Sequence, residues 1–438
     1  ALIWLAYQYL PTLWSRTTQK AREMRGEVVT FKRTTPSFNE MLHQGGAFPS
    51  LLGSADAGLR SKGHGGVPGS ILWQKETPLP YAMSPTVGPN ERVLIPCYAN
   101  IEGNKGQSFV AYNAQGTLLW QMPLENIGAS QCWLENGCSL LVGTTQPIYN
   151  VTEYASTSLV MVNPDGKEMW RWNRSSLGSG LINDLQTTSE GQVLLNDRME
   201  HLFSWKSNGE TLWQNPLPVK SSIVNLASDA QGHIFSACRG GNGDALYCLN
   251  KEGKTLWKQE QVKIASRGVV GDDGNLRVVT KDRQGTRIQY SLLCLNPSGE
   301  ELWHSQPLDI DGDSTQNIVV IALSNAGKTI LLGIREILCL DKKGNVLWKE
   351  PLPNSLNNLL NLWYGMVVSS DGYIYVDTSR GIYTLAPNGH TLDIISIPGY
   401  HITGMALGDK RLYLTAFDTS SSPVKGHLIA YELKPPTN

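Results

Sequence analysis

One short motif recurs along the chain at nearly constant spacing. The pattern Gly-x-x-Leu/Met-Trp occurs seven times, and the interval from one tryptophan to the next stays between 43 and 50 residues. An eighth copy, Gly389 to Asp393, keeps the glycine and loses the aromatic residue. The seven tryptophans are Trp73, Trp120, Trp170, Trp213, Trp257, Trp303 and Trp348. Self-similarity at this period predicts a repeat fold rather than the two or three separate domains that 438 residues would otherwise suggest.

The residues around each motif predict β-hairpins. A turn such as Asn113–Gly116 or Asn296–Gly299 opens with a residue that bonds its own backbone and ends with a glycine that tolerates positive φ. A short apolar run precedes the turn, and Leu-Trp follows it. A second turn, such as Ser370–Gly372, joins two more short strands in the same repeat. Four strands, named A to D here, in about 45 residues are the size of one propeller blade.

The strand count indicates how the ring closes. The last C strand, His427–Tyr431, has no D strand after it, and the first D strand, Ser70–Gln74, has no C strand before it. Ser70–Gln74 is therefore expected to complete the blade of residues 404–433, which removes the open sheet edges. The prediction is an all-β, eight-bladed β-propeller of four-stranded antiparallel blades, closed by an N-terminal outer strand.

The residues before the propeller differ from it in composition. Residues 1–14 are mostly apolar, and residues 1–33 hold six basic and two acidic side chains. This pattern favours a membrane anchor, with the cations near anionic headgroups, or a segment that docks on a partner. Residues 34–68 contain seven glycines and three prolines, which is typical of a linker. The expected division is a segment 1–33, a linker 34–68 and a propeller 69–438.

Charge and hydropathy argue against a nucleic-acid-binding protein and against a complete membrane span within these residues. The formal net charge is -1, whereas a nucleic-acid-binding protein is normally basic. No stretch of 18 apolar residues occurs, so no complete membrane span lies within these residues.

The Gly-x-x-Leu-Trp motif after an apolar strand resembles the PQQ-like repeat. The resemblance covers residues 69–433, and this superfamily includes quinoprotein alcohol dehydrogenases and BamB-like propellers. Its catalytic members bind PQQ with a metal ion and often carry a disulfide of adjacent cysteines, whereas no adjacent cysteine pair is present here. The resemblance thus implies a non-catalytic, extracytoplasmic scaffold without PQQ, which binds protein partners in a membrane-associated assembly. The alternative is a PQQ-dependent oxidoreductase. No catalytic residues are predicted.

Binding is expected on the face that carries the D–A and B–C loops. These loops are long and differ from blade to blade, and one of them is predicted over Lys281–Ser291. Variable loops on a rigid scaffold usually carry the binding residues. Residues that end the D–A loops should ring the mouth of the central channel, together with Trp363 of the loop Asn361–Gly365. The predicted ligand- or partner-binding residues are Tyr81, Asn183, Arg267, Trp363, Tyr364 and His401. A water-filled funnel is the alternative.

One acidic segment has the spacing of metal ligands. Asp309, Asp311, Asp313 and Asn317 place oxygens at positions 1, 3, 5 and 9, which resembles a calcium loop. The glycine comes early at position 312, and no glutamate stands at position 12. The prediction is a Ca²⁺ site, and the alternative is a solvated acidic turn.

The seven cysteines are not expected to form a disulfide framework. Cys248, Cys294 and Cys339 occupy the same place in successive C strands, and equivalent positions of neighbouring blades lie too far apart to bond. They are expected to be small buried residues, while Cys132 and Cys138 flank one turn and leave a disulfide open there. The repeat tryptophans are expected to pack between blades rather than to form a stacking platform.

Overall fold

The structure is a computed structural model of the whole chain. It describes residues 64–98, 107–124, 127–133, 137–144, 156–175, 182–188, 191–197, 201–216, 221–240, 243–285, 287–310, 320–324, 326–352, 366–378, 381–418 and 420–435. The predicted segment 1–33 and most of the linker therefore lie outside the described residues, and the predicted division into 1–33, 34–68 and 69–438 remains a prediction. All described residues belong to one compact unit, Gly45–Asn438.

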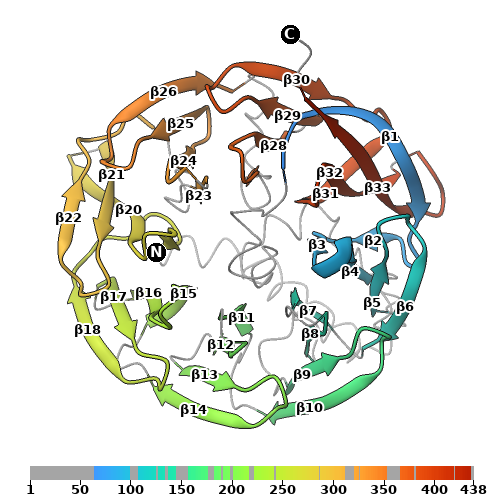
Figure 1. Cartoon of the computed structure of the whole chain (residues 1–438), viewed down its shortest axis with the longest axis horizontal. Helices are drawn as coiled ribbons and strands as arrows, with labels where there is room; N and C mark the ends of the chain where they lie inside the picture. Colours follow the sequence, from blue (N-terminus) through green and yellow to red (C-terminus); the bar gives the residue numbers. More distant parts are fainter. Residues whose placement is uncertain are drawn as a thin grey trace, which may run out of the picture. The chain divides into compact units, whose positions relative to one another are not determined.

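The described residues form eight antiparallel sheets arranged as a ring, with the D strands on the outside (Figure 1). Blade 1 consists of β2 (Tyr81–Ala82), β3 (Thr86–Val87), β4 (Val93–Tyr98), β5 (Gln107–Tyr112) and β6 (Leu118–Pro123), and blade 2 of β7 (Ile127–Trp133), β8 (Ser139–Thr144), β9 (Ser156–Val162) and β10 (Glu168–Ser175). Blade 3 consists of β11 (Ile182–Thr187), β12 (Val193–Asp197), β13 (His201–Trp205) and β14 (Thr211–Pro216), and blade 4 of β15 (Ser221–Ser228), β16 (Ile234–Gly240), β17 (Ala245–Leu249) and β18 (Thr255–Glu260).

The remaining blades follow the same order from the centre outwards. Blade 5 consists of β19 (Val269–Val270), β20 (Leu276–Gln284), β21 (Arg287–Leu295) and β22 (Glu301–His304), and blade 6 of β23 (Val320–Leu323), β24 (Thr329–Leu332), β25 (Glu336–Leu340) and β26 (Val346–Pro351). Blade 7 consists of β27 (Met366–Val368), β28 (Ile374–Thr378), β29 (Gly381–Leu385) and β30 (Thr391–Ile395), and blade 8 of β31 (Tyr400–Leu407), β32 (Arg411–Asp418), β33 (Lys425–Lys434) and β1 (Val67–Glu76). Blade 1 splits its A strand into β2 and β3, with a 3-10 turn, Pro89–Glu91, before β4. The predicted eight-bladed, all-β fold is confirmed.

The ring closes through the N-terminal strand, as predicted. β1 lies antiparallel to β33, from Val67 opposite Lys434 to Glu76 opposite His427. The approach to β1 is also fixed, because the buried Tyr375 hydroxyl donates to the Gly66 carbonyl at 2.7 Å and accepts from the Gly66 N–H at 2.8 Å. The first and last segments of the propeller are thereby held in one sheet.

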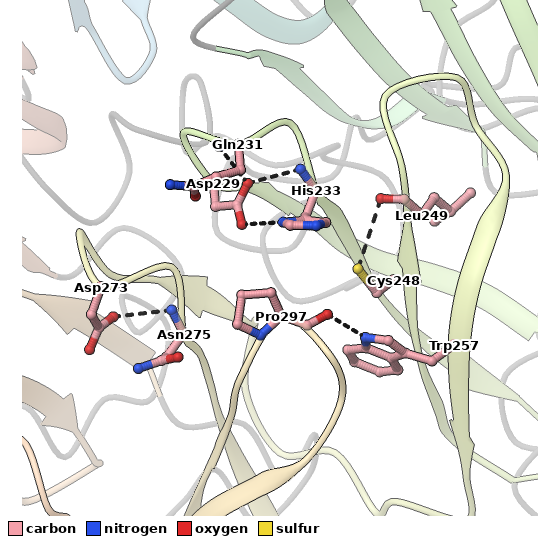
Figure 2. Close-up of polar contacts among 9 residues, drawn as sticks. All are labelled: Asp229, Gln231, His233, Cys248, Leu249, Trp257, Asp273, Asn275 and Pro297. Carbon is pink, nitrogen blue, oxygen red and sulfur yellow. Dashed lines mark hydrogen bonds and ion pairs between the residues drawn. The ribbon is translucent and has the colours of Figure 1, made fainter.

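Each repeat tryptophan packs under the C–D turn of the next blade. Figure 2 shows the pair formed by Trp257 of blade 4 and the turn of blade 5, where Trp257 Nε1 donates to the Pro297 carbonyl at 2.8 Å. A Cβ on Gly299 of that turn would lie only 2.8 Å from the indole, and its φ is +85°. Glycine is required there for both reasons. Four other tryptophans donate in the same way to a turn carbonyl: Trp73 to Ala114, Trp170 to Ser207, Trp213 to Lys251 and Trp348 to Pro387.

The ring also explains why the eighth motif lacks its tryptophan. Asp393 lies on β30 of blade 7, so its neighbour around the ring is blade 8. In blade 8 the C strand is β33 and the D strand is β1, which come from opposite ends of the propeller and have no turn between them. A tryptophan at position 393 would therefore have no turn glycine to pack against. Seven turns match seven tryptophans.

The equivalent cysteines lie in the core, as expected. Cys248, Cys294 and Cys339 are buried and stand opposite Trp257, Trp303 and Trp348 in the register of their blades. Burial raises the pKa of the Cys248 and Cys339 thiols to about 12 and that of Cys294 to about 11. These thiols are protonated and act as small apolar residues. The side chain of Cys132 lies outside the described residues, so the Cys132–Cys138 disulfide remains an open alternative.

Candidate partner-binding face

Alternating strand directions give the ring two different faces. The A–B and C–D turns lie on one, called the turn face, and the D–A and B–C loops lie on the other, called the loop face. C–D turns repeat one pattern of hydrogen bonds, in which the glycine N–H donates to the carbonyl of the first turn residue, as in Gly116 to Asn113 and Gly299 to Asn296. The loop face has no comparable repeat among the described residues.

Two of the predicted binding residues come together on the loop face. Tyr81 begins β2 in blade 1, and His401 lies at the start of β31 in blade 8. Phe417 of β32 lies between them, with its ring centroid 5.8 Å from that of Tyr81 and 4.9 Å from that of His401. All three side chains are half-buried. Residues more than 300 positions apart in the sequence thus form one aromatic group on the loop face.

The environment of this aromatic group defines what it can bind. Burial lowers the pKa of His401, so its imidazole is neutral at neutral pH. Rings that keep part of their surface exposed bind apolar or aromatic side chains through their faces and edges. Phe417 was missed as a candidate because only the register of β31 against β32 places it opposite His401.

A polar network lies beside the aromatic group and ties the closing strand to blade 8. The amide Nε2 of Gln74 on β1 donates to the Tyr400 hydroxyl at 2.9 Å and to Nδ1 of His427 at 3.2 Å. The rings of Tyr400 and His427 meet edge to face, with centroids 5.2 Å apart. Tyr400 directly precedes His401 on β31, so the network and the aromatic group share this end of the strand.

The other predicted residues are separate from this group or outside the described residues. Arg267 lies half-buried in the D–A loop that enters blade 5, where Ser266 Oγ donates to its carbonyl at 2.7 Å and accepts from the Val279 N–H at 2.8 Å. Asn183 lies on β11, and its side chain is not among those described. Trp363 and Tyr364 fall outside the described residues.

Only one of the four predicted calcium ligands is described. Asp309 has a fully exposed side chain, and Lys349 Nζ donates to its Oδ2 at 2.7 Å and to its carbonyl at 2.8 Å. That ammonium lowers the pKa of Asp309. Asp311, Asp313 and Asn317 lie outside the described residues, where the calcium site remains a prediction. Within the described residues, no three His, Cys, Asp or Glu side chains are placed to hold a metal ion.

In the described part of the chain, no helix is long and apolar enough to cross a membrane.

Solved structures share the propeller fold. BamB from Moraxella catarrhalis is 14% identical, with a TM-score of 0.53 over 83% of this chain and 99% of that one. The Dos1 propeller is 10% identical, with a TM-score of 0.60 over 84% and 96% of the two chains. The quinohemoprotein alcohol dehydrogenase ADHIIG from Pseudomonas putida HK5 is 9% identical, with a TM-score of 0.52 over 84% and 78%. Identities this low show the fold alone.

Sequence comparison assigns the family. None of the curated proteins is a detectable relative. The family model described as outer membrane protein assembly factor BamB matches residues 198–434, which is more than half of the 438 residues. The match spans the tryptophan motifs from Trp213 onward, which the structure shows at the contacts between blades. The chain belongs to the outer membrane protein assembly factor BamB family.

Proposed function

We propose that this propeller is a non-catalytic scaffold that binds partner proteins through its loop face. The observation that carries the proposal is the match to the BamB family model, whose description names an assembly factor. The aromatic group of Tyr81, His401 and Phe417 supports the choice of face, because half-exposed aromatic side chains are enriched where proteins bind one another.

The same family match supports a location outside the cytoplasm, at a membrane. The family description names an outer membrane assembly process, and residues 1–33 combine an apolar segment with a basic one. We propose that this segment makes the membrane contact, through the apolar residues and anionic headgroups.

Cross-linking in native membranes tests the scaffold proposal. A tagged chain should capture one or more discrete proteins. The double variant Tyr81→Ala/Phe417→Ala should capture much less, because it removes two of the three rings from the loop face. The control Gln115→Ala/Ser298→Ala changes exposed residues of two C–D turns and should capture as much as the wild type. Equal melting temperatures would show that the variants are folded. Undiminished capture by the aromatic variant would contradict the use of this part of the face.

A PQQ-dependent oxidoreductase is the second candidate, favoured by the shared fold with a quinohemoprotein alcohol dehydrogenase. Reconstitution with PQQ and calcium distinguishes the two functions. The scaffold proposal predicts no stoichiometric quinone absorption and no dye-linked alcohol oxidation. Stoichiometric absorption with turnover would overturn it.

A further inference from the structure

The B–C connection of blade 5 is a protruding hairpin rather than the loop expected over Lys281–Ser291. β20 and β21 pair through nine consecutive positions, from Leu276 opposite Leu295 to Gln284 opposite Arg287. Among the described residues, the B and C strands of blades 1–4, 6 and 7 pair through four to six positions, and those of blade 8 through eight. The additional pairs lie at the loop-face end, so the B–C pairing of blade 5 reaches further on that face than the pairing described for the other blades.

The hairpin is braced on both sides at its base. On one side the D–A loop runs along β20, with Ala265 N–H donating to the Val279 carbonyl at 2.7 Å and Lys281 N–H to the Lys263 carbonyl at 2.8 Å. On the other side the Leu308 N–H donates to the Tyr290 carbonyl at 2.7 Å. The base is therefore a built sheet, and we call residues 261–268, 279–285 and 287–291 the cationic wing.

The name reflects the charge of these residues. The cationic wing contains five basic side chains and one acidic one, a formal charge of +4 in a chain whose total is -1. The acidic residue, Asp282, already accepts from Lys263 Nζ at 2.6 Å. Arg283 and Arg287 are exposed, and within the described part of the chain neither is paired with a carboxylate. The basic residues are Lys263, Arg267, Lys281, Arg283 and Arg287.

The tip of the cationic wing also offers free backbone. Beyond Lys281 on one edge and Tyr290 on the other, the described residues provide no further pairing strand. Its described residues include none of the exposed large hydrophobic side chains, so apolar contact does not define this surface. Free strand edges accept an extended segment through main-chain hydrogen bonds, and guanidinium groups bind carboxylates in a bidentate manner.

We propose that the cationic wing binds an extended, acidic segment of a partner protein. The proposal rests on the scaffold function and specifies the chemistry of one partner. Carboxylate side chains on the segment would pair with Arg283 and Arg287, while its backbone lies along the free edge of β20 or β21. The positive field of the cationic wing would also speed the encounter at low salt.

A peptide-binding experiment on the full chain tests the proposal. The probe is a fluorescein-labelled peptide of alternating glutamate and valine, followed by fluorescence anisotropy. The wild type should bind it, and Arg283→Glu/Arg287→Glu should bind about tenfold or more weakly, because two attractions become repulsions. The control Lys254→Glu/Lys342→Glu makes the same charge change at exposed turn-face positions and should stay within about twofold of wild type.

Several results would overturn the proposal. Equal weakening by the control would show attraction without a site, and equal binding of the glutamine counterpart of the peptide would show that charge is irrelevant. Binding to vesicles of phosphatidylcholine and phosphatidylglycerol without binding to the peptide would assign the surface to lipid. Aggregation of the arginine variant with unchanged peptide affinity would mean that the cations only protect a strand edge.

The capture experiment separates this proposal from the scaffold function. If wild type and Arg283→Glu/Arg287→Glu capture the same partner equally well from native membranes, the acidic-segment proposal fails and the scaffold function stands. If the wild type captures nothing, the scaffold function fails, and the peptide measurement alone decides what the cationic wing binds.

Discussion

The turn face and the loop face of the ring are built on opposite principles. On the turn face one device recurs in seven blades, an indole packed under a glycine turn, as Trp257 packs against Gly299. On the loop face the described residues show no such repeat, with an aromatic group at blades 8 and 1 and the cationic wing on blade 5. The difference indicates that the regular residues build the ring and that the irregular ones are available for binding. Changes on the two faces should therefore separate stability from partner capture.

Removing the closing strand should have the largest effect. Deletion of residues 1–76 takes away β1, and with it both the pairing to β33 and the contact of Trp73 with the turn of blade 1. The exposed edge of β33 should cause aggregation or loss of cooperative unfolding. Deletion of residues 1–63 leaves β1 and Gly66 in place and should leave the melting temperature unchanged. A soluble monomer with wild-type melting after the longer deletion would show that β1 does not close the ring.

Loss of a single tryptophan contact should come next. Trp257→Ala removes the hydrogen bond to Pro297 and the packing on Gly299, and it should cost about 3 kcal/mol of unfolding free energy. The neighbouring Leu256 is 48% exposed, so Leu256→Ala should cost less than about 0.5 kcal/mol. Denaturant unfolding measures both. Similar costs for the two variants would contradict the role assigned to the repeat tryptophans.

The buried carboxyl group of Asp377, near the loop face, should lower the free energy of unfolding of the propeller. Asp377, the fourth residue of β28, is 2% exposed, and neither carboxyl oxygen has a hydrogen-bond partner within the described structure. Three other blades have Ala237, Val279 and Leu332 at the equivalent place of the register. Asp377→Ala should therefore stabilise the propeller by about 1–2 kcal/mol at neutral pH. Asp165→Ala, at an exposed turn position, should change little.

The pH dependence of the Asp377 effect has a defined sign. Burial raises the pKa of Asp377 well above 3.8, so the folded state holds a proton that the unfolded state releases. Stability is then lost as pH rises from that ordinary value toward the raised one. The advantage of Asp377→Ala should therefore grow with pH in thermal unfolding. An advantage that shrinks as pH rises would contradict the assignment of a protonated carboxyl.

The smallest expected effect comes from His427, which belongs to the polar network with Gln74 and Tyr400. Burial lowers the pKa of His427 below 6.5, so the unfolded state binds more protons just below that pH. Its contribution to stability is complete above 6.5 and is lost as pH falls toward the folded-state value. The melting temperature should fall on acidification, and His427→Gln should flatten this dependence. His390→Gln, at an exposed turn position, should leave the profile unchanged.

The ring could be predicted from the sequence because each blade repeats the same local chemistry. The turn glycine (Gly299 in blade 5), the tryptophan (Trp257 in blade 4) and the buried cysteine (Cys294 in blade 5) have equivalents at the same place in other blades. One type of hairpin therefore accounts for all three, and the count of strands predicts how the ring closes. The positions of Tyr81 and His401 on the loop face also follow from the repeat. Their contact with Phe417 does not, because it depends on the register between β31 and β32.

Two further features could not be predicted from local patterns. The strands at the tip of the cationic wing lack apolar alternation, because the tip extends beyond the core. The polar run Lys281–Gln284 therefore predicts a loop rather than a strand. Asp377 is a charged residue in a predicted strand, and such residues normally face water. Its exposure of 2% in the ring is therefore not apparent from the local sequence.

Site-specific photo-cross-linking in the native host tests the separation of the two faces most directly. A photoreactive amino acid would replace Tyr81 or Arg283 on the loop face and Gln115 or Ser298 on the turn face, one position at a time. We predict discrete adducts with partner proteins from the loop-face positions and none above background from the turn-face positions. Adducts from the turn-face positions with none from Tyr81 or Arg283 would contradict the assignment of binding to the loop face.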